Sequence, residues 1–170
     1  MIAITAILLA IAVPNYLSAR ERARDSKRKQ EMAQLKGALR MYYNDYAKYP
    51  QSGGMSQTCS LNGVTYRNSI MGCGVDGLQC CPNAVNTCVG LEFSAGAGGC
   101  ANIYMKKFPS DFGDTMHYFL NADTDQFCLK VTLENRADGD LAASRIRCAS
   151  ACTIGQASML SDSDYALCAD

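Results

Sequence analysis

A long helical pattern in the first third of the chain constrains the fold more than any other feature. Between Asn15 and about Lys48 the chain contains no proline and only one glycine, Gly37, and Ala, Arg, Lys, Glu, Gln, Leu and Met are abundant. All seven of these residue types favour the α-helix. In the second half of the segment, apolar residues recur at steps of three and four, which predicts one apolar stripe that packs against a globular body. The stripe consists of Met32, Leu35, Leu39, Tyr42 and Tyr46.

The first half of this helical segment has a different character. Small residues such as Ala19 and Ala23 replace the apolar stripe, and residues 20–40 hold eight Lys/Arg against three Asp/Glu. We expect this half to project from the body. Its charges, between Arg20 and Lys29, then form a solvated face or pair with neighbouring subunits. Pro14 predicts a kink or local unwinding, and Pro50 ends the helix because a residue that precedes proline disfavours the α conformation.

An uncharged apolar run, Met1 to Val13, precedes the helical segment. As a helix it rises about 20 Å, which is short of the ~30 Å hydrocarbon core of a bilayer. A secretory signal peptide is the alternative, but no basic residue precedes the run and no small-residue cleavage site follows it. We expect instead that the chain shown begins inside a longer apolar helix, which needs about eight further residues to span a membrane.

Ten cysteines, an even number, lie between residues 59 and 168. The chain has one histidine, His117, and no Cys-x-x-Cys-His motif, so Cys/His zinc sites and covalent haem are disfavoured. Disulfides formed in an oxidising compartment are the favoured interpretation, and a thiolate metal cluster is the alternative. We expect adjacent Cys80 and Cys81 to have different partners, and Cys168 to tie the C-terminal segment to a sheet. The predicted disulfide residues are Cys59, Cys73, Cys80, Cys81, Cys88, Cys100, Cys128, Cys148, Cys152 and Cys168.

The remainder of the chain predicts an α+β fold in which a small antiparallel β-sheet packs on the long N-terminal helix. Alternating apolar residues predict strands at 115–121 and 126–133, joined by a turn at 122–125, and a third short strand at 144–149. The Gly-, Ser-, Asn- and Cys-rich segment 51–103 predicts a loop-rich, disulfide-stapled insert with short strands near 64–70 and 89–93. The predicted parts are a projecting stem at 1–31 and a globular head at 32–170, the latter divided into the insert 51–103, the sheet 104–148 and a disulfide-tied C-terminal segment 149–170.

The run AIAVPNYLSARERARDSKRKQEMAQLKGALRMYYNDYAKYP resembles the N-terminal region of type IV pilins and of type II secretion pseudopilins. In those families an apolar helix ends in a segment like Pro14-Asn15-Tyr16, and the amphipathic helix that follows ends in a Tyr-Pro such as Tyr49-Pro50. The resemblance covers residues 3–50, is weaker over 104–133, and is absent from 51–103. One feature departs from the family pattern, since no acidic residue precedes Glu21 and the Pro-Asn-Tyr segment comes about eight residues early.

The resemblance implies a major pilin, a structural protein that polymerises through its N-terminal helix into an extracellular type IV pilus. It implies an inner-membrane anchor before assembly, cleavage and N-methylation by a prepilin peptidase, and contact with the pilus assembly machinery. Stacking of identical subunits through a heterologous interface produces fibres. A pseudopilin and a membrane-anchored binding or adhesin domain are the alternatives, and the sequence does not choose among adhesion, motility, DNA uptake and secretion. The implied membrane and assembly residues are Ile2, Ile4, Ile7, Leu8, Leu9, Ile11, Val13, Pro14, Tyr16 and Leu17.

Enzymatic and nucleic-acid functions are not expected. The chain contains no Gly-x-Ser-x-Gly, His-Glu-x-x-His or Walker motif, and no aromatic residues are interleaved with the basic ones of the stem. No cofactor is expected apart from a possible calcium ion, because acidic residues at i and i+2 in loops suit Ca²⁺. Asp162 and Asp164 are the candidate ligands, since pseudopilins often hold calcium in a C-terminal loop; the alternative is that they are plain turn residues.

Overall fold

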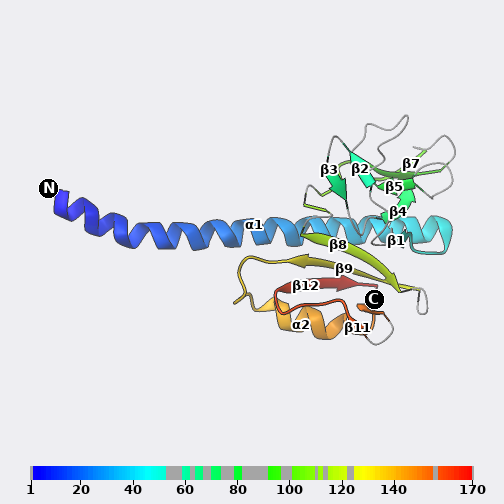
Figure 1. Cartoon of the computed structure of the whole chain (residues 1–170). Coiled ribbons are helices and arrows are strands. Elements are labelled where there is room, and N and C mark those ends of the chain that lie inside the picture. Colours follow the sequence, from blue (N-terminus) through cyan, green and yellow to red (C-terminus); the bar gives the residue numbers. More distant parts are fainter. Residues whose placement is uncertain are drawn as a thin grey trace.

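A computed structural model confirms the α+β class, with one long N-terminal helix and small antiparallel sheets. Helix α1 (Ile2–Tyr46) extends well beyond the head, which lies alongside its C-terminal half (Figure 1). Side chains are described from residue 15 onwards, except in 59–61, 64–66, 71–73, 79–81 and 154. The structure describes residues 2–52, 59–61, 64–66, 70–73, 79–81, 92–96, 101–109, 111–112, 115–121, 125–154 and 157–169.

The sequence predicted a kink or local unwinding at Pro14 and a helix that ends before Pro50. The backbone stays helical through Pro14 without unwinding, while the helix axis changes direction among its N-terminal turns (Figure 1). The helix ends at Tyr46, four residues before Pro50. Ala47 follows with a left-handed φ of 54° and donates its amide to Tyr43 O at 2.7 Å, which closes the last turn.

The central sheet has the order β12-β9-β8 and is antiparallel throughout. Strands β8 (Met116–Asn121) and β9 (Gln126–Thr132) form the predicted hairpin, in register from Met116↔Val131 to Asn121↔Gln126. Of the predicted turn at 122–125, only Asp125 lies within the described residues.

The predicted third strand at 144–149 is wrong, because most of this segment is helix α2 (Asp140–Arg147). Leu141, Ser144 and Cys148 are buried at a helical spacing, and Asp140 at the start and Arg145 and Arg147 at the end complement the helix dipole. The third strand of the sheet is instead β12 (Asp164–Cys168), which pairs with β9 from Asp164↔Thr132 to Cys168↔Cys128. The C-terminal segment is therefore part of the sheet itself.

The two helices cover opposite faces of this sheet. Alternate side chains of β9, such as Phe127, Leu129 and Val131, belong to the main core together with the stripe of α1. Cys128 and Ala166 point to the other face and form a smaller core with Cys148 and Cys152 at and after the end of α2. This alternation produces three layers, with α1 and α2 on either side of the sheet (Figure 1).

The apolar stripe of α1 is largely as predicted. Met32, Leu35, Leu39 and Tyr42 are buried, whereas Tyr46 keeps 36% of its surface exposed. Tyr46 lies beyond the end of the core, and its ring packs against Tyr42 at 4.5 Å between centroids.

Along the chain between α1 and the central sheet, the residues that the structure describes form strands of two to four residues. Ile70 in β4 and Phe93 in β6 bring this region into the main core. The predicted strand at 64–70 corresponds to two strands, β3 and the start of β4, and most of the predicted strand at 89–93 lies outside the described residues. The strands are β1 (Gln51–Ser52), β2 (Cys59–Leu61), β3 (Val64–Tyr66), β4 (Ile70–Cys73), β5 (Gln79–Cys81), β6 (Phe93–Ala95) and β7 (Asn102–Met105), and a two-stranded hairpin of β10 (Thr153–Ile154) and β11 (Ala157–Ser158) follows α2.

Candidate functional site

The N-terminal half of α1 projects from the head (Figure 1). Among the side chains of α1 that are described, from residue 15 onwards, Asp25 is the first that is buried, and Tyr16 and Leu17 keep 67% and 51% of their surface exposed. The segment from Ile2 to Arg24 is 23 helical residues long, or about 34 Å at ~1.5 Å per residue. The predicted assembly residues Ile2, Ile4, Ile7, Leu8, Leu9, Ile11, Val13 and Pro14 all lie in this helix, and their side chains are outside the described residues.

In the part of the chain that the structure describes, no helix combines the length and the apolar character required to cross a lipid bilayer.

A group of charged side chains joins α1 to the head at the point where the helix emerges from it. We call this group the charged clamp. It consists of Arg24, Asp25, Arg28 and Lys29 of α1, together with Asp111, Glu134, Asp138 and Asp140 of the head.

Asp25 is the centre of the charged clamp and is only 2% exposed. Its Oδ1 accepts hydrogen bonds from Arg28 Nη1 and from the backbone amide of Glu134, both at 3.0 Å, and its Oδ2 accepts one from the amide of Asn135 at 2.8 Å. A buried carboxylate requires such partners, because an unpaired one carries a large desolvation penalty. Asp25 thereby fixes the chain that leaves β9 against the stem helix.

Two arginines of α1 extend the clamp to the head. Arg28 Nε donates to Asp111 Oδ2 at 3.1 Å, and its Nη1 lies 3.0 Å from Glu134 Oε1. Arg24 binds the carboxylate of Glu134 through both Nε and Nη2, in a bidentate arrangement. The hydrogen bonds from Arg24 and the positive charges of Arg24 and Arg28 lower the pKa of Glu134, so this carboxylate stays ionised in mildly acidic solution.

Lys29 connects α1 to the start of α2. Its Nζ lies 2.6 Å from Asp138 Oδ1 and 2.9 Å from Asp140 Oδ2, and 5.1 Å from the centre of the Tyr165 ring. Burial alone would raise the pKa of Asp138, but hydrogen bonds from Lys29 and from the amide of Asp140 outweigh burial and lower it. Lys29 therefore holds the beginning of α2 against the stem.

These contacts correct the interpretation of Arg20 to Lys29 as a solvated face or as charges reserved for neighbouring subunits. Arg24, Arg28 and Lys29 pair within the chain, and Lys27 lies 3.5 Å from Glu31 on the same helix. Arg20 and Arg22 are exposed and have no ion-pair partner within the described part of the chain. The sequence did not predict the clamp because the acidic residues that the head contributes lie 83 to 111 residues further along the chain.

A shallow groove of about 420 Å³ lies at the opposite end of the head. It runs between the outer face of α1 and strand β7, and Met41 and Ile103 in it keep 49% and 47% of their surface exposed. Asp45 in the groove accepts a hydrogen bond from Tyr104 Oη at 2.8 Å. The full lining is Met41, Asn44, Asp45, Ala101, Asn102, Ile103 and Tyr104.

Four of the predicted disulfide residues form two disulfides, Cys128–Cys152 and Cys148–Cys168. Both cross-link the layer of α2 to the central sheet. Cys168 was expected to tie a loose segment to the sheet, but it lies in β12 and ties that strand to the residue after α2. The side chains of Cys59, Cys73, Cys80, Cys81, Cys88 and Cys100, and so their partners, are outside the described residues.

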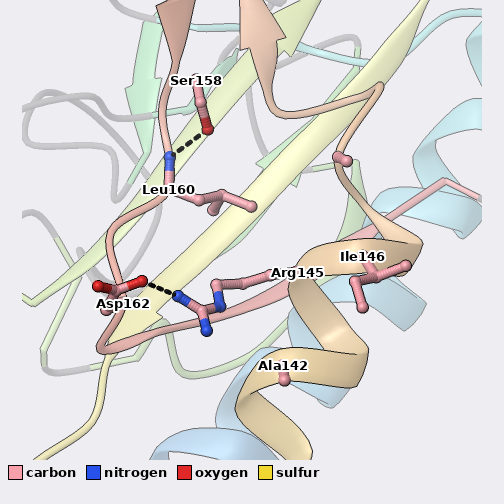
Figure 2. Close-up of a pocket in the computed structure, with 7 residues that line it drawn as sticks. Ala142, Arg145, Ile146, Ser158, Leu160 and Asp162 are labelled. Carbon is pink, nitrogen blue, oxygen red and sulfur yellow. Dashed lines mark hydrogen bonds and ion pairs between the residues drawn. The ribbon is translucent and has the colours of Figure 1, made fainter.

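The candidate calcium ligands have other partners. Asp164 is buried and accepts hydrogen bonds from Lys130 Nζ at 3.0 Å, Thr132 Oγ1 at 2.8 Å and the amide of Ser161 at 2.9 Å. Burial alone would raise the pKa of Asp164, but these bonds outweigh it and lower the pKa. Asp162 is exposed and pairs with Arg145 at 2.6 Å (Figure 2).

A cation bound to both Asp162 and Asp164 would have to displace Lys130 and Arg145 from their carboxylates. Among the residues that the structure describes, no group of three or more His, Cys, Asp or Glu side chains is arranged to hold a metal ion.

Comparisons of the chain with protein-family models, with curated proteins and with solved structures found no match.

Proposed function

We propose that the chain is a structural subunit that polymerises through its N-terminal helix into an extracellular filament of the type IV pilus class. The observation that carries the proposal is the projecting part of α1, which begins in an uncharged apolar run and extends well beyond the head (Figure 1). Such a segment needs another apolar surface, which stems of identical subunits can provide for one another.

Two further features support this proposal. The charged clamp and the buried stripe of α1 hold the stem to the head at several points, so a contact made by one stem positions the attached head. The disulfides Cys128–Cys152 and Cys148–Cys168 suit a head that works in an oxidising compartment outside the cytoplasm.

The test is isolation of surface filaments from cells that produce the chain, followed by electron microscopy and mass spectrometry of the filament subunits. We expect this chain to be the dominant subunit. Filaments that contain only other subunits, or assemblies that never leave the cell envelope, would contradict the proposal.

A variant pair makes this experiment specific. Ile7→Glu with Ile11→Glu places two charges one turn apart in the apolar run and should abolish filaments while the head keeps its melting temperature. Arg136→Gln, an exposed change in the head, is the matched control and should leave filament yield unchanged.

A further inference from the structure

We propose that the groove between α1 and β7 receives the projecting stem of a second copy of this chain, with Arg20 of one copy paired with Asp45 of the other. The inference rests on the proposed function, that the chain polymerises, and it names the surface on the head that the neighbouring stem occupies.

The groove is lined in part by apolar side chains that are exposed to water. Met41 from the helix and Ile103 from the strand lie on its two sides, and each exposes about half of its surface. Single exposed apolar residues are common on protein surfaces, and two large ones that line the same groove give it an apolar surface for a partner to cover. The groove is therefore suited to apolar side chains such as Tyr16 and Leu17.

Gly37 leaves the approach to the groove open. A Cβ placed on Gly37 would meet nothing within 4 Å, so no contact within the described chain requires glycine there. Glycine inside a helix costs roughly 1 kcal/mol relative to alanine. Gly37, Met41 and Asp45 follow one another at intervals of four residues and share one face of α1. Because Gly37 has no side chain, another helix can approach the backbone closely at this point of the face.

The charges of the groove and of the projecting stem complement each other. Asp45 is exposed, and its hydrogen bond comes from a neutral phenol, without a basic partner in the described chain. Arg20 is also exposed, and it has no acidic partner among the described residues. Tyr16, Leu17 and Arg20 lie within roughly 100° of one another around the helix, since each residue turns it by about 100°. The stem thus presents two apolar groups and a cation to a groove that presents two apolar groups and an anion.

The spacing along the helix allows this contact without a clash between heads. If the stems are parallel and Leu17 of one copy lies beside Met41 of the next, the two copies are offset along the helix axis by 24 residues, or about 36 Å. The head lies alongside α1 from Asp25 to Tyr46, which is 22 residues and a rise of about 32 Å. The second head therefore begins just beyond the end of the first.

Charge reversal tests the pair within filaments. Arg20→Asp and Asp45→Arg should each lower filament yield about fivefold, and the two changes combined should restore it. Arg22→Asp removes an exposed arginine from another face of the same helix and should have little effect. Melting temperatures of the isolated Arg20→Asp and Arg22→Asp variants should equal that of the wild type, whereas Asp45→Arg also removes the acceptor of the Tyr104 hydroxyl.

Two further measurements keep the inference distinct from the proposed function. A photo-cross-linking residue in place of Met41 should join to Tyr16, Leu17 or Arg20 of another copy, and Gly37→Gln should block assembly without lowering the melting temperature. Normal filaments from both single charge variants, without this cross-link, would overturn the docking site while the filament function stands. A discrete dimer joined at the same residues would overturn the stacked arrangement, and a wild-type chain absent from filaments would overturn the proposed function itself.

Discussion

Charged side chains hold α1 against the head around Asp25, where the helix leaves the head. Aromatic rings hold it around Tyr42, near the C-terminal end of the helix. The charged clamp is centred on Asp25, which accepts bonds from Arg28 and from two backbone amides of the head. Around Tyr42, the rings of Tyr46, Phe93 and Tyr104 lie at centroid distances of 4.5, 5.7 and 5.5 Å. The same helix therefore uses two kinds of chemistry about 17 residues apart.

The difference follows from how close each end is to the projecting stem. Where α1 leaves the head, side chains are partly exposed, so apolar groups there would remove little surface from water. Hydrogen bonds also fix an orientation, because their strength depends on angle. Aromatic packing supplies more burial per residue but less directional control. We infer that the aromatic end supplies most of the stability and that the charged end sets the direction of the stem.

Tyr42→Ala should have the largest effect, because it removes the ring that the aromatic end packs around. We expect a loss of about 4 kcal/mol in the free energy of unfolding, typical of a buried aromatic side chain. Urea denaturation measures it. Tyr43→Ala, an exposed neighbour, is the control and should cost much less. Equal losses for the two variants would show that the aromatic end is not the main source of stability.

Removal of the Cys148–Cys168 disulfide should loosen the layer of α2 rather than the aromatic rings around Tyr42. Replacement of both cysteines by serine should cost about 3 kcal/mol, from the entropy of a loop closed over 20 residues. Because Cys148 follows α2 and Asp138 and Asp140 lie at its start, hydrogen exchange should rise in residues 134–147. A rise confined to residues 93–105 would contradict this assignment.

Asp25→Ala should cost roughly 3 kcal/mol, because it leaves two backbone amides and part of Arg28 without their acceptor. The variant should also change the angle between stem and head, which small-angle X-ray scattering of the purified chain can measure. Glu21→Ala, one turn closer to the N-terminus, is the control and should change neither quantity.

Acid and alkali should act on opposite ends of the interface. Glu134 and Asp138 have lowered pKa values, so their contribution is present above the ordinary carboxyl pKa near 4 and is lost as the pH falls below it. Burial raises the pKa of Tyr104 and of Tyr118, so their contribution is present below about pH 10 and is lost above it. Hydrogen exchange should increase first near residues 134–140 in acid and near residues 102–118 in alkali. An earlier increase near residues 102–118 in acid, or near residues 134–140 in alkali, would contradict the assignment of charged and aromatic contacts to different ends of the interface.

Gly37→Ala should have the smallest effect, and of opposite sign. The position is open, so alanine should stabilise the chain by about 0.5–1 kcal/mol. Thermal unfolding monitored by circular dichroism measures it. A destabilised variant would mean that the outer face of α1 is already in contact with something in the folded chain.

The sequence alone determined the elements whose signal is local. Steps of three and four marked the buried stripe from Met32 to Tyr42, and alternation marked the β8–β9 hairpin, because both patterns reflect the geometry of a single element. The even set of cysteines predicted disulfides, of which Cys128–Cys152 and Cys148–Cys168 are described.

The tertiary structure decided everything that depends on distant partners. Ser144–Arg147 alternates in sequence but forms part of a helix, in which Leu141, Ser144 and Cys148 are buried at a helical spacing. In the sequence Asp25 looks like a surface charge, whereas in the folded chain it is buried and accepts hydrogen bonds from the amides of Glu134 and Asn135. Asp162 and Asp164 are neighbours along the chain, yet one faces solvent and the other is buried beside Lys130. Local pattern sets which elements form, whereas which charges are paired depends on how the chain folds back on itself.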